Sequence, residues 1–209
     1  MTDATGEPVA PRERWNARYA AAAFAPFPDA PADWLVEHRA LLAGLQTQGR
    51  MPRALDVACG DGRNARWLAE LGFSVDAVDV SDVAIGALRR AAEERELTIQ
   101  PSVVDLESEA LAVGEYDVVL CMHYLQRELF GALQVALRPG GLLIYETFTR
   151  AHVEELGRSF NLAFALERNE LLHAFLGLHV RHYREGVVDR GERSRAVASL
   201  VAQLPADDG

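Results

Sequence analysis

One segment of the sequence combines acidic and small residues at a spacing that suits cofactor binding: residues 56–62, DVACGDG. It ends a predicted strand and opens a predicted helix. Small residues let a backbone approach a ligand closely, and the N–H groups of a helix start attract negative groups. Asp79 ends the next predicted strand, where a carboxylate can accept hydrogen bonds from ribose hydroxyls. This combination predicts a site for a cofactor that contains a nucleoside.

The same residues favour one cofactor over another. Gly60, Gly62 and Ala65 match the Gly-x-Gly-x-x-Gly/Ala pattern of nicotinamide dinucleotide sites. Asp56, however, stands inside the strand, four residues before Gly60. A carboxylate there can face an ammonium group, which S-adenosylmethionine has and the pyrophosphate of a dinucleotide lacks. The segment therefore favours S-adenosylmethionine.

With these residues the chain resembles the class I S-adenosylmethionine-dependent methyltransferases. The first motif of that family is acid-x-Gly-x-Gly-x-Gly, and Ala58 stands here in place of its first glycine. Asp105-Leu106 lies where the family reads the adenine amino group. Residues 116–121, YDVVLC, resemble the fourth-strand motif, and residues 138–141, RPGG, resemble the motif before the fifth strand. Together these motifs span about residues 53–148.

The N-terminal residues 15–19, WNARY, and residues 60–64, GDGRN, resemble the tellurite-resistance and thiopurine branch of this family. Trp15, Arg18 and Tyr19 fall at i, i+3 and i+4, so they share one face of a helix. The resemblance implies that this helix closes over the methionine end of the cofactor. An amphipathic helix that packs its aromatic residues on the core is the alternative. The cofactor-binding residues expected from the motifs and the resemblance are Trp15, Arg18, Tyr19, Asp56, Ala58, Cys59, Gly60, Gly62, Asp79, Val80, Asp105, Leu106 and Cys121.

Arg63 breaks a local rule. A cation in the first turn of a helix opposes the helix dipole by about 0.3–1 kcal/mol. Residues that violate local rules cluster at functional sites. Our hypothesis is that Arg63 faces an anion, either the substrate or the carboxylate of the cofactor. The alternative is an exposed arginine whose side chain reaches water.

Substrates of open α/β sheets approach the carboxyl ends of the strands, which points to residues 123–124 and 145–147. His123 is the candidate general base if the acceptor must lose a proton, whereas a soft nucleophile needs mainly alignment. Residues 149–165 are expected to form a lid. The locally basic residues Arg190, Arg193 and Arg195 are interpreted as a solvated hairpin rather than an anion site. The expected substrate residues are Arg63, Tyr124, Tyr145, Arg158 and Asn161.

No metal site is expected. His179 and His182 are three residues apart on a predicted strand and would therefore point to opposite faces. Cys59 lies in the cofactor segment, far from other candidate ligands.

The elements that must position these residues alternate along the chain. Strands are predicted at 53–58, 73–79, 98–104, 116–121 and 142–147. Helices are predicted after the first, second and fourth of them, and Pro139–Gly141 is a break before the fifth strand. Strands at 178–184 and 195–203, joined by the polar stretch 185–194, would add a hairpin. The fold class is α/β: a Rossmann-like, doubly wound, mostly parallel seven-stranded sheet with a C-terminal antiparallel hairpin and helices on both faces. A single domain is expected over 1–209, with a helical cap at 1–50, a cofactor-binding core at 51–148, and a lid, short helix and terminal strands at 149–204.

Composition excludes several function classes. All 21 basic residues are arginine, so a lysine Schiff base or a phosphate-binding lysine is excluded. The net charge of −10 argues against a broad nucleic-acid surface and favours a small-molecule partner. The N-terminus lacks a secretory pattern, no apolar stretch is long enough to span a membrane, and two distant cysteines suggest no disulfide framework. A cytoplasmic monomer or homodimer is expected.

The sequence therefore predicts an S-adenosylmethionine-dependent methyltransferase. Direct in-line displacement would carry the methyl group to a small-molecule acceptor such as a thiol, a chalcogen oxyanion or a metabolite. The alternatives are a non-catalytic S-adenosylmethionine sensor or partner subunit, an NAD(P)-binding oxidoreductase, and a methyltransferase for RNA or protein. The sequence does not specify the acceptor.

Overall fold

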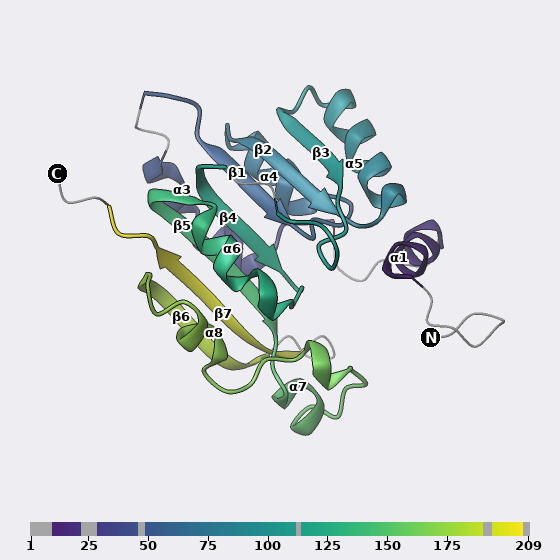
Figure 1. The fold of residues 1–209 in the computed structure, drawn as a ribbon, viewed down its shortest axis with the longest axis vertical. Coiled ribbons are helices and arrows are strands. Elements are labelled where there is room, and N and C mark those ends of the chain that lie inside the picture. Colours follow the sequence, from purple (N-terminus) through teal and green to yellow (C-terminus); the bar gives the residue numbers. More distant parts are fainter. Residues whose placement is uncertain (1–9, 22–28, 46–48, 112–113, 190–193, 207–209) are drawn as a thin grey trace.

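Seven strands form one twisted sheet in the structure, a computed structural model that describes residues 10–21, 29–45, 49–111, 114–189 and 194–206 (Figure 1). The order across the sheet is β3-β2-β1-β4-β5-β7-β6. The first five strands run parallel, and β7 runs antiparallel between β5 and β6. The predicted fold is confirmed. The strands are β1 (Arg53–Val57), β2 (Ser74–Asp79), β3 (Ile99–Val103), β4 (Tyr116–Met122), β5 (Leu137–Phe148), β6 (His179–Val188) and β7 (Arg195–Gln203).

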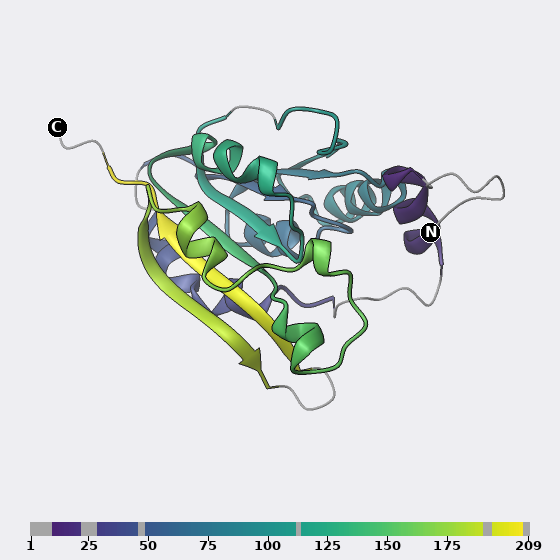
Figure 2. The same ribbon diagram turned by 60° about the horizontal axis from the view of Figure 1, so that its bottom comes forward.

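Helices cover both faces of the sheet (Figures 1 and 2). Every residue of β4 is buried, because its side chains alternate between two separate apolar clusters. Four helices pack on one face: α2 (Asp33–Glu37), α3 (Arg39–Leu45), α4 (Arg63–Glu70) and α5 (Asp82–Glu94). Two helices cover the opposite face, α6 (Phe130–Val135) and α8 (Glu170–Ala174).

Helix α1 (Pro11–Ala20) lies at the periphery, beside α5, and none of its residues is buried (Figure 1). It is therefore held by specific contacts rather than by a packed apolar face. Three short helical segments complete the described chain: η1 (Arg127–Leu129), α7 (Ala151–Glu154) and η2 (Leu162–Phe164).

Two helix ends of the structure are explained by local signals in the sequence. The Ser81 side chain accepts a hydrogen bond of 3.2 Å from the Ala84 backbone N–H and so caps α5. Gly72 has a φ of +91° directly after the last turn of α4, the left-handed conformation that ends helices at glycine.

Three predictions about strands are wrong. The fifth strand begins at Leu137 rather than after Pro139–Gly141, because Gly141 lets β5 approach β4 closely. A Cβ atom on Gly141 would lie 2.8 Å from the Tyr116 carbonyl oxygen. Strand β6 continues to Val188, into the stretch 185–194 that was expected to be a polar connection.

The third correction concerns the two histidines of β6. A bulge between Val180 and His182 places His179 opposite Gln203 and His182 opposite Val201. Because Gln203 and Val201 are two residues apart on β7, both histidines lie on the same face. Within the described ranges, no group of three or more His, Cys, Asp or Glu residues could hold a metal ion. Nor does any helix in that part of the chain have the length and apolarity to cross a membrane.

Candidate active site

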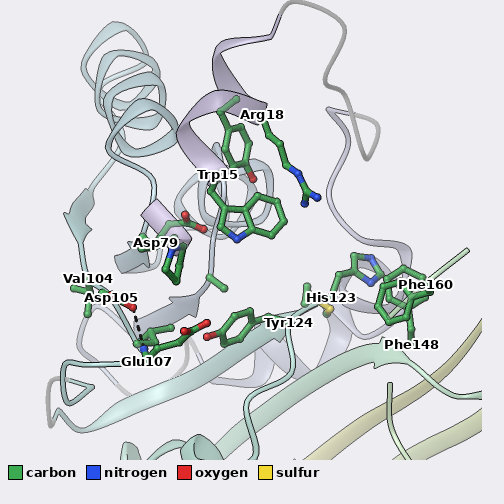
Figure 3. Close-up of a pocket in the computed structure, with 16 residues that line it drawn as sticks. Trp15, Arg18, Asp79, Val104, Asp105, Glu107, His123, Tyr124, Phe148 and Phe160 are labelled. Atoms are coloured by element: carbon green, nitrogen blue, oxygen red, sulfur yellow. Dashed lines mark hydrogen bonds between the residues drawn. The ribbon is translucent and has the colours of Figure 1, made fainter. Parts of the chain in front are cut away.

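A cavity of about 250 Å³ opens at the carboxyl ends of the parallel strands and is bounded on one side by α1 (Figure 3). Asp79, Val104 and Asp105 lie at one end, and His123, Phe148 and Phe160 lie at the other. The first group follows β2 and β3, and the second follows β4 and β5. The cavity is therefore where the sequence analysis expects a cofactor, at the edge where the strand order reverses.

Three residues of the glycine segment, two of them glycines, adopt the left-handed backbone conformation. Ala58, Gly60 and Gly62 have φ values of +55°, +58° and +81°, all in the left-handed region. A side chain on Gly62 would collide with Leu88 of α5, and one on Gly60 would collide with the Tyr19 hydroxyl. These glycines allow α4 to start against α5 and α1 to lie directly over the segment.

Asp79 fastens this segment to β2. Its two carboxylate oxygens accept hydrogen bonds of 2.9 Å from the backbone N–H groups of Gly60 and Ser81. Burial raises the pKa of Asp79, and the backbone N–H donors of Ser81, Gly60 and Val80 oppose that rise. The carboxylate also lines the cavity, so it can both shape the loop and contact a ligand.

Asp56 is a buried carboxyl, 1% exposed, beneath the same segment. Burial raises the pKa of Asp56 to about 7, and the nearby charge of Arg63 acts against this rise. Its Oδ2 atom has no hydrogen-bond partner among the described residues. A cation close to this oxygen would stabilise the ionised form of the buried carboxyl. This observation fits the ammonium group of S-adenosylmethionine and would not suit a pyrophosphate.

Helix α1 brings three expected cofactor residues to the cavity wall. Trp15, Arg18 and Tyr19 all line it, and the Arg18 guanidinium lies 4.8 Å from the centre of a Trp15 ring (Figure 3). Asn16 attaches the helix: its side-chain oxygen accepts a hydrogen bond of 2.8 Å from the Ser81 hydroxyl, and its amide donates to Asp82. Asn16 is not among the site residues expected from the sequence. Its place inside the WNARY motif is the feature that could have indicated its role.

Two of the expected adenine-side residues, Asp105 and Leu106, line the cavity together with Val80. One Asp105 carboxylate oxygen accepts a hydrogen bond of 3.1 Å from the Glu107 N–H. Cys59 and Cys121 are buried and do not line either cavity described here.

His123 lines both this cavity and a second one. Its φ of +58° turns the chain sharply after β4, and its N–H donates to the Glu146 carbonyl at 2.7 Å. Its ring stacks on Phe148, with ring centres 5.3 Å apart. Burial and the charges of Arg195 and Arg63 hold the pKa of His123 well below its usual value. The imidazole is therefore neutral at physiological pH.

The second cavity, of about 120 Å³, lies on the other side of His123. Arg63, Arg184, Arg195 and Glu146 line it. The interpretation of Arg195 as part of a solvated hairpin is wrong, because the antiparallel pairing of β7 with β5 brings the start of β7 to the cavity. Arg190 and Arg193 lie outside the described residues.

Three expected substrate residues lie away from both cavities. Tyr145 is fully buried and donates a hydrogen bond of 2.8 Å to the Tyr124 carbonyl. Arg158 and Asn161 are exposed, and the Asn161 side chain caps η2 by accepting from the Ala163 N–H at 3.0 Å. Tyr124, in contrast, lines the first cavity.

Phe148 and Phe160 form an aromatic wall of the first cavity, and no sequence motif predicts this wall. Phe148 ends β5, and the rings of the two residues lie 4.9 Å apart. Arg184, in the middle of β6, lines the second cavity and was likewise not expected from the sequence. Its position depends on strand pairing and has no local signal.

Comparison with known proteins agrees with this geometry. Residues 54–141 match the family described as "Methyltransferase domain". The chain is 32% identical over 123 residues to a ubiquinone biosynthesis O-methyltransferase of Burkholderia multivorans, covering 56% of this chain and 50% of that protein. It spans about half the length of the curated relatives it matches.

Two solved structures share the fold over most of the chain. TehB from Haemophilus influenzae aligns with a TM-score of 0.65 and 19% identity, covering 92% of this chain and 66% of that one. Magnesium protoporphyrin IX methyltransferase from Synechocystis, solved with S-adenosylhomocysteine bound, aligns with a TM-score of 0.64 and 19% identity, covering 92% and 93%.

The fold, the glycine segment and its acidic partners are those expected of a class I methyltransferase domain. Residues 54–141 match the model of a methyltransferase domain, and the residues of the cavity fit S-adenosylmethionine as the cofactor.

Proposed function

We propose that the whole chain transfers a methyl group from S-adenosylmethionine to a small-molecule acceptor. The observation that carries the proposal is the position of His123, which lines both the cavity of the cofactor residues and the arginine-lined cavity beside it. A cofactor site beside a second, chemically different cavity suits a transfer between two substrates.

The residues of the first cavity divide the work of holding the cofactor. Asp79 accepts from the ribose hydroxyls, and Asp105-Leu106 faces the adenine. Arg18 and Tyr19 close over the carboxylate end. Asp56, which lies beneath the glycine segment and outside the cavity lining, balances the ammonium charge. Bound S-adenosylmethionine supplies an electrophilic methyl group on a positively charged sulfur.

The chain's own contribution to transfer is alignment and proton removal. The walls of the two cavities hold the acceptor atom in line with the methyl carbon and the leaving sulfur, which lowers the entropic cost of reaction. Neutral His123 takes the proton from an acceptor hydroxyl or thiol. The aromatic wall of Phe148 and Phe160 holds the apolar part of the acceptor.

Two finer statements belong to the same proposal. The WNARY helix over the glycine segment supports placement in the tellurite-resistance and thiopurine branch, although the matched relatives are O-methyltransferases. The net charge of −10 supports a small molecule rather than RNA as acceptor. We also place the protein in the cytoplasm, where its two free cysteines would stay reduced.

The test is a methyl-transfer assay with S-adenosylmethionine and a panel of hydroxyl and thiol acceptors. The readouts are S-adenosylhomocysteine formation and a product heavier by one methylene. We expect turnover with at least one acceptor and its loss in Asp79→Ala. Cofactor binding without turnover across the panel would favour a sensor or partner subunit, and binding of NAD instead would favour an oxidoreductase.

A further inference from the structure

Gln126, in the loop after β4, connects two walls of the first cavity. Its side-chain nitrogen donates a hydrogen bond of 2.7 Å to the Leu106 carbonyl oxygen, and its side-chain oxygen accepts one of 2.6 Å from the Tyr124 hydroxyl. Leu106 and Tyr124 both line the cavity, whereas Gln126 is not among the described residues that do. Any effect of Gln126 on a ligand is therefore exerted through these two partners.

The chemistry of the three groups fixes the orientation of the Gln126 amide. A backbone carbonyl only accepts hydrogen bonds, so the amide nitrogen must face Leu106. The amide oxygen then faces the Tyr124 hydroxyl. Burial raises the pKa of that hydroxyl, which therefore stays protonated and donates. Each group thus has the partner that its chemistry requires.

The backbone next to Gln126 is anchored to a different part of the fold. The Arg127 guanidinium donates hydrogen bonds of 3.2 and 3.1 Å to the carbonyl oxygens of Ala163 and Ala165. It also donates to the Glu170 carboxylate at 2.6 Å. Gln126 therefore extends its side chain from a backbone that is held in place, which makes it a suitable support for the residues that it contacts.

The loop that receives the hydrogen bond from Gln126 follows β3 and carries Asp105. Within it, the Glu109 carboxylate accepts from the Asp105 N–H at 2.9 Å, and the Asp105 carboxylate accepts from the Glu107 N–H at 3.1 Å. These bonds set the shape of the loop but not its distance from β4. Figure 3 shows the Tyr124 hydroxyl directed towards the same loop. The contacts of Tyr124 and Gln126 therefore join the loop to the chain that leaves β4.

A group that binds a ligand must be held within about 0.5 Å of its productive position by the residues behind it. We propose that Gln126 is a positioning residue for the adenine of the cofactor, because its hydrogen bond to the Leu106 carbonyl sets the place of Asp105-Leu106. The inference rests on the proposed function, in which Asp105-Leu106 faces the adenine. It adds a residue outside the cavity lining that controls affinity for adenine and its discrimination from other purines.

The test compares two ligands that differ at the adenine amino group. Calorimetry measures the dissociation constants of S-adenosylhomocysteine and of its hypoxanthine analogue, S-inosylhomocysteine, for the wild type and Gln126→Leu. The wild type should prefer S-adenosylhomocysteine. We expect Gln126→Leu to bind S-adenosylhomocysteine about tenfold more weakly, the value of one to two hydrogen bonds, and the analogue less than about threefold more weakly. The preference for adenine therefore falls.

Gln134→Leu is the matched control. Gln134 is half-buried like Gln126, and its side-chain amide also donates to a backbone carbonyl, that of Ala174 at 3.4 Å. It lies on α6, outside the lining of the first cavity, so its variant should bind both ligands like the wild type.

Gln126→Glu identifies which half of the amide matters. An ionised glutamate keeps an oxygen that can accept from Tyr124 but has no N–H to donate to Leu106. It should bind S-adenosylhomocysteine as weakly as Gln126→Leu does. Urea unfolding of each variant shows that it is folded.

The proposal is overturned if Gln126→Leu binds S-adenosylhomocysteine like the wild type. It is also overturned if that variant weakens both ligands by the same factor, as a general disturbance of the structure would. Asp105→Ala distinguishes these results from a failure of the proposed function. If Asp105→Ala leaves the affinity unchanged, the adenine assignment is wrong; if it weakens binding while Gln126→Leu does not, only the role of Gln126 is wrong.

Discussion

The Ser81 hydroxyl donates a hydrogen bond of 2.8 Å to the side-chain oxygen of Asn16. This contact is one link in a continuous chain, since the Ser81 N–H donates to Asp79 and Asp79 also accepts from the Gly60 N–H. Helix α1, the cap of α5, the end of β2 and the glycine segment are thus joined by consecutive hydrogen bonds. Because α1 buries none of its residues, these contacts hold it over the cavity.

Asn16→Ala should weaken binding of S-adenosylhomocysteine by about tenfold, the value of one to two hydrogen bonds. Global stability should change little, because α1 contributes no buried residue. Calorimetric titration and urea unfolding measure the two quantities. Arg12→Ala, on an exposed position of the same helix, is the control. Equal affinities of Asn16→Ala and wild type would show that α1 does not depend on this attachment.

The pKa of Asp56 makes a prediction about stability and pH. Burial raises this pKa from its ordinary 3.8 to about 7, so between these values the folded protein binds more protons than the unfolded chain. Asp56 should therefore make the ligand-free protein less stable as pH rises towards 7, by at most about 1.4 kcal/mol per pH unit, and add no dependence above it.

Urea unfolding of wild type and Asp56→Asn between pH 5.5 and 8 isolates this effect, since the other acids cancel in the difference. The stability of wild type relative to Asp56→Asn should fall as pH rises to about 7 and then stay level. A difference that is constant with pH would show that the carboxyl titrates normally.

His123→Gln should reduce kcat by about a hundredfold, the lower range for a general base, and leave the affinity for S-adenosylhomocysteine unchanged. Burial and the charges of Arg195 and Arg63 lower the pKa of His123 well below its usual value. We expect kcat to lack an inflection near the ordinary histidine pKa of about 6.5. An inflection of kcat near this pH, or full activity of His123→Gln, would contradict the role of His123 as the general base.

Ala58 occupies a left-handed position, with a φ of +55°, where the resembled family has glycine. Ala58→Gly should therefore raise the free energy of unfolding by about 0.5–1 kcal/mol, the strain relieved less the added freedom of the unfolded chain. The same change at Ala87, inside α5, should lower it by about 1 kcal/mol. Urea unfolding of both variants measures whether the free energy of unfolding rises in the first and falls in the second. Destabilisation by Ala58→Gly would contradict the assignment of strain.

The cofactor half of the site was predictable because its signals are local. Gly60, Gly62 and Asp79 lie on consecutive elements of one strand-helix-strand unit, and parallel strands bring their carboxyl ends to one edge. The arginine-lined cavity was not predictable in the same way. Arg195 reaches it through pairing of β7 with β5, where Val197 lies opposite Phe148, and such long-range register leaves no local pattern.

Tyr145 and Glu146 show why the sequence alone does not tell which residue of a strand faces a cavity. Both follow the same predicted strand, but successive residues point to opposite faces, so one enters the core and the other lines the second cavity. Deciding between them requires the register of β5 against β4, where Tyr145 lies opposite Cys121.

The most direct measurement of the central claim is calorimetric titration of the wild-type protein with S-adenosylhomocysteine and, separately, with NAD. We predict saturable one-to-one binding of S-adenosylhomocysteine, weakened in Asp79→Ala, and no binding of NAD. Binding of NAD without binding of S-adenosylhomocysteine would contradict the assignment of the glycine segment and the methyl transfer built on it.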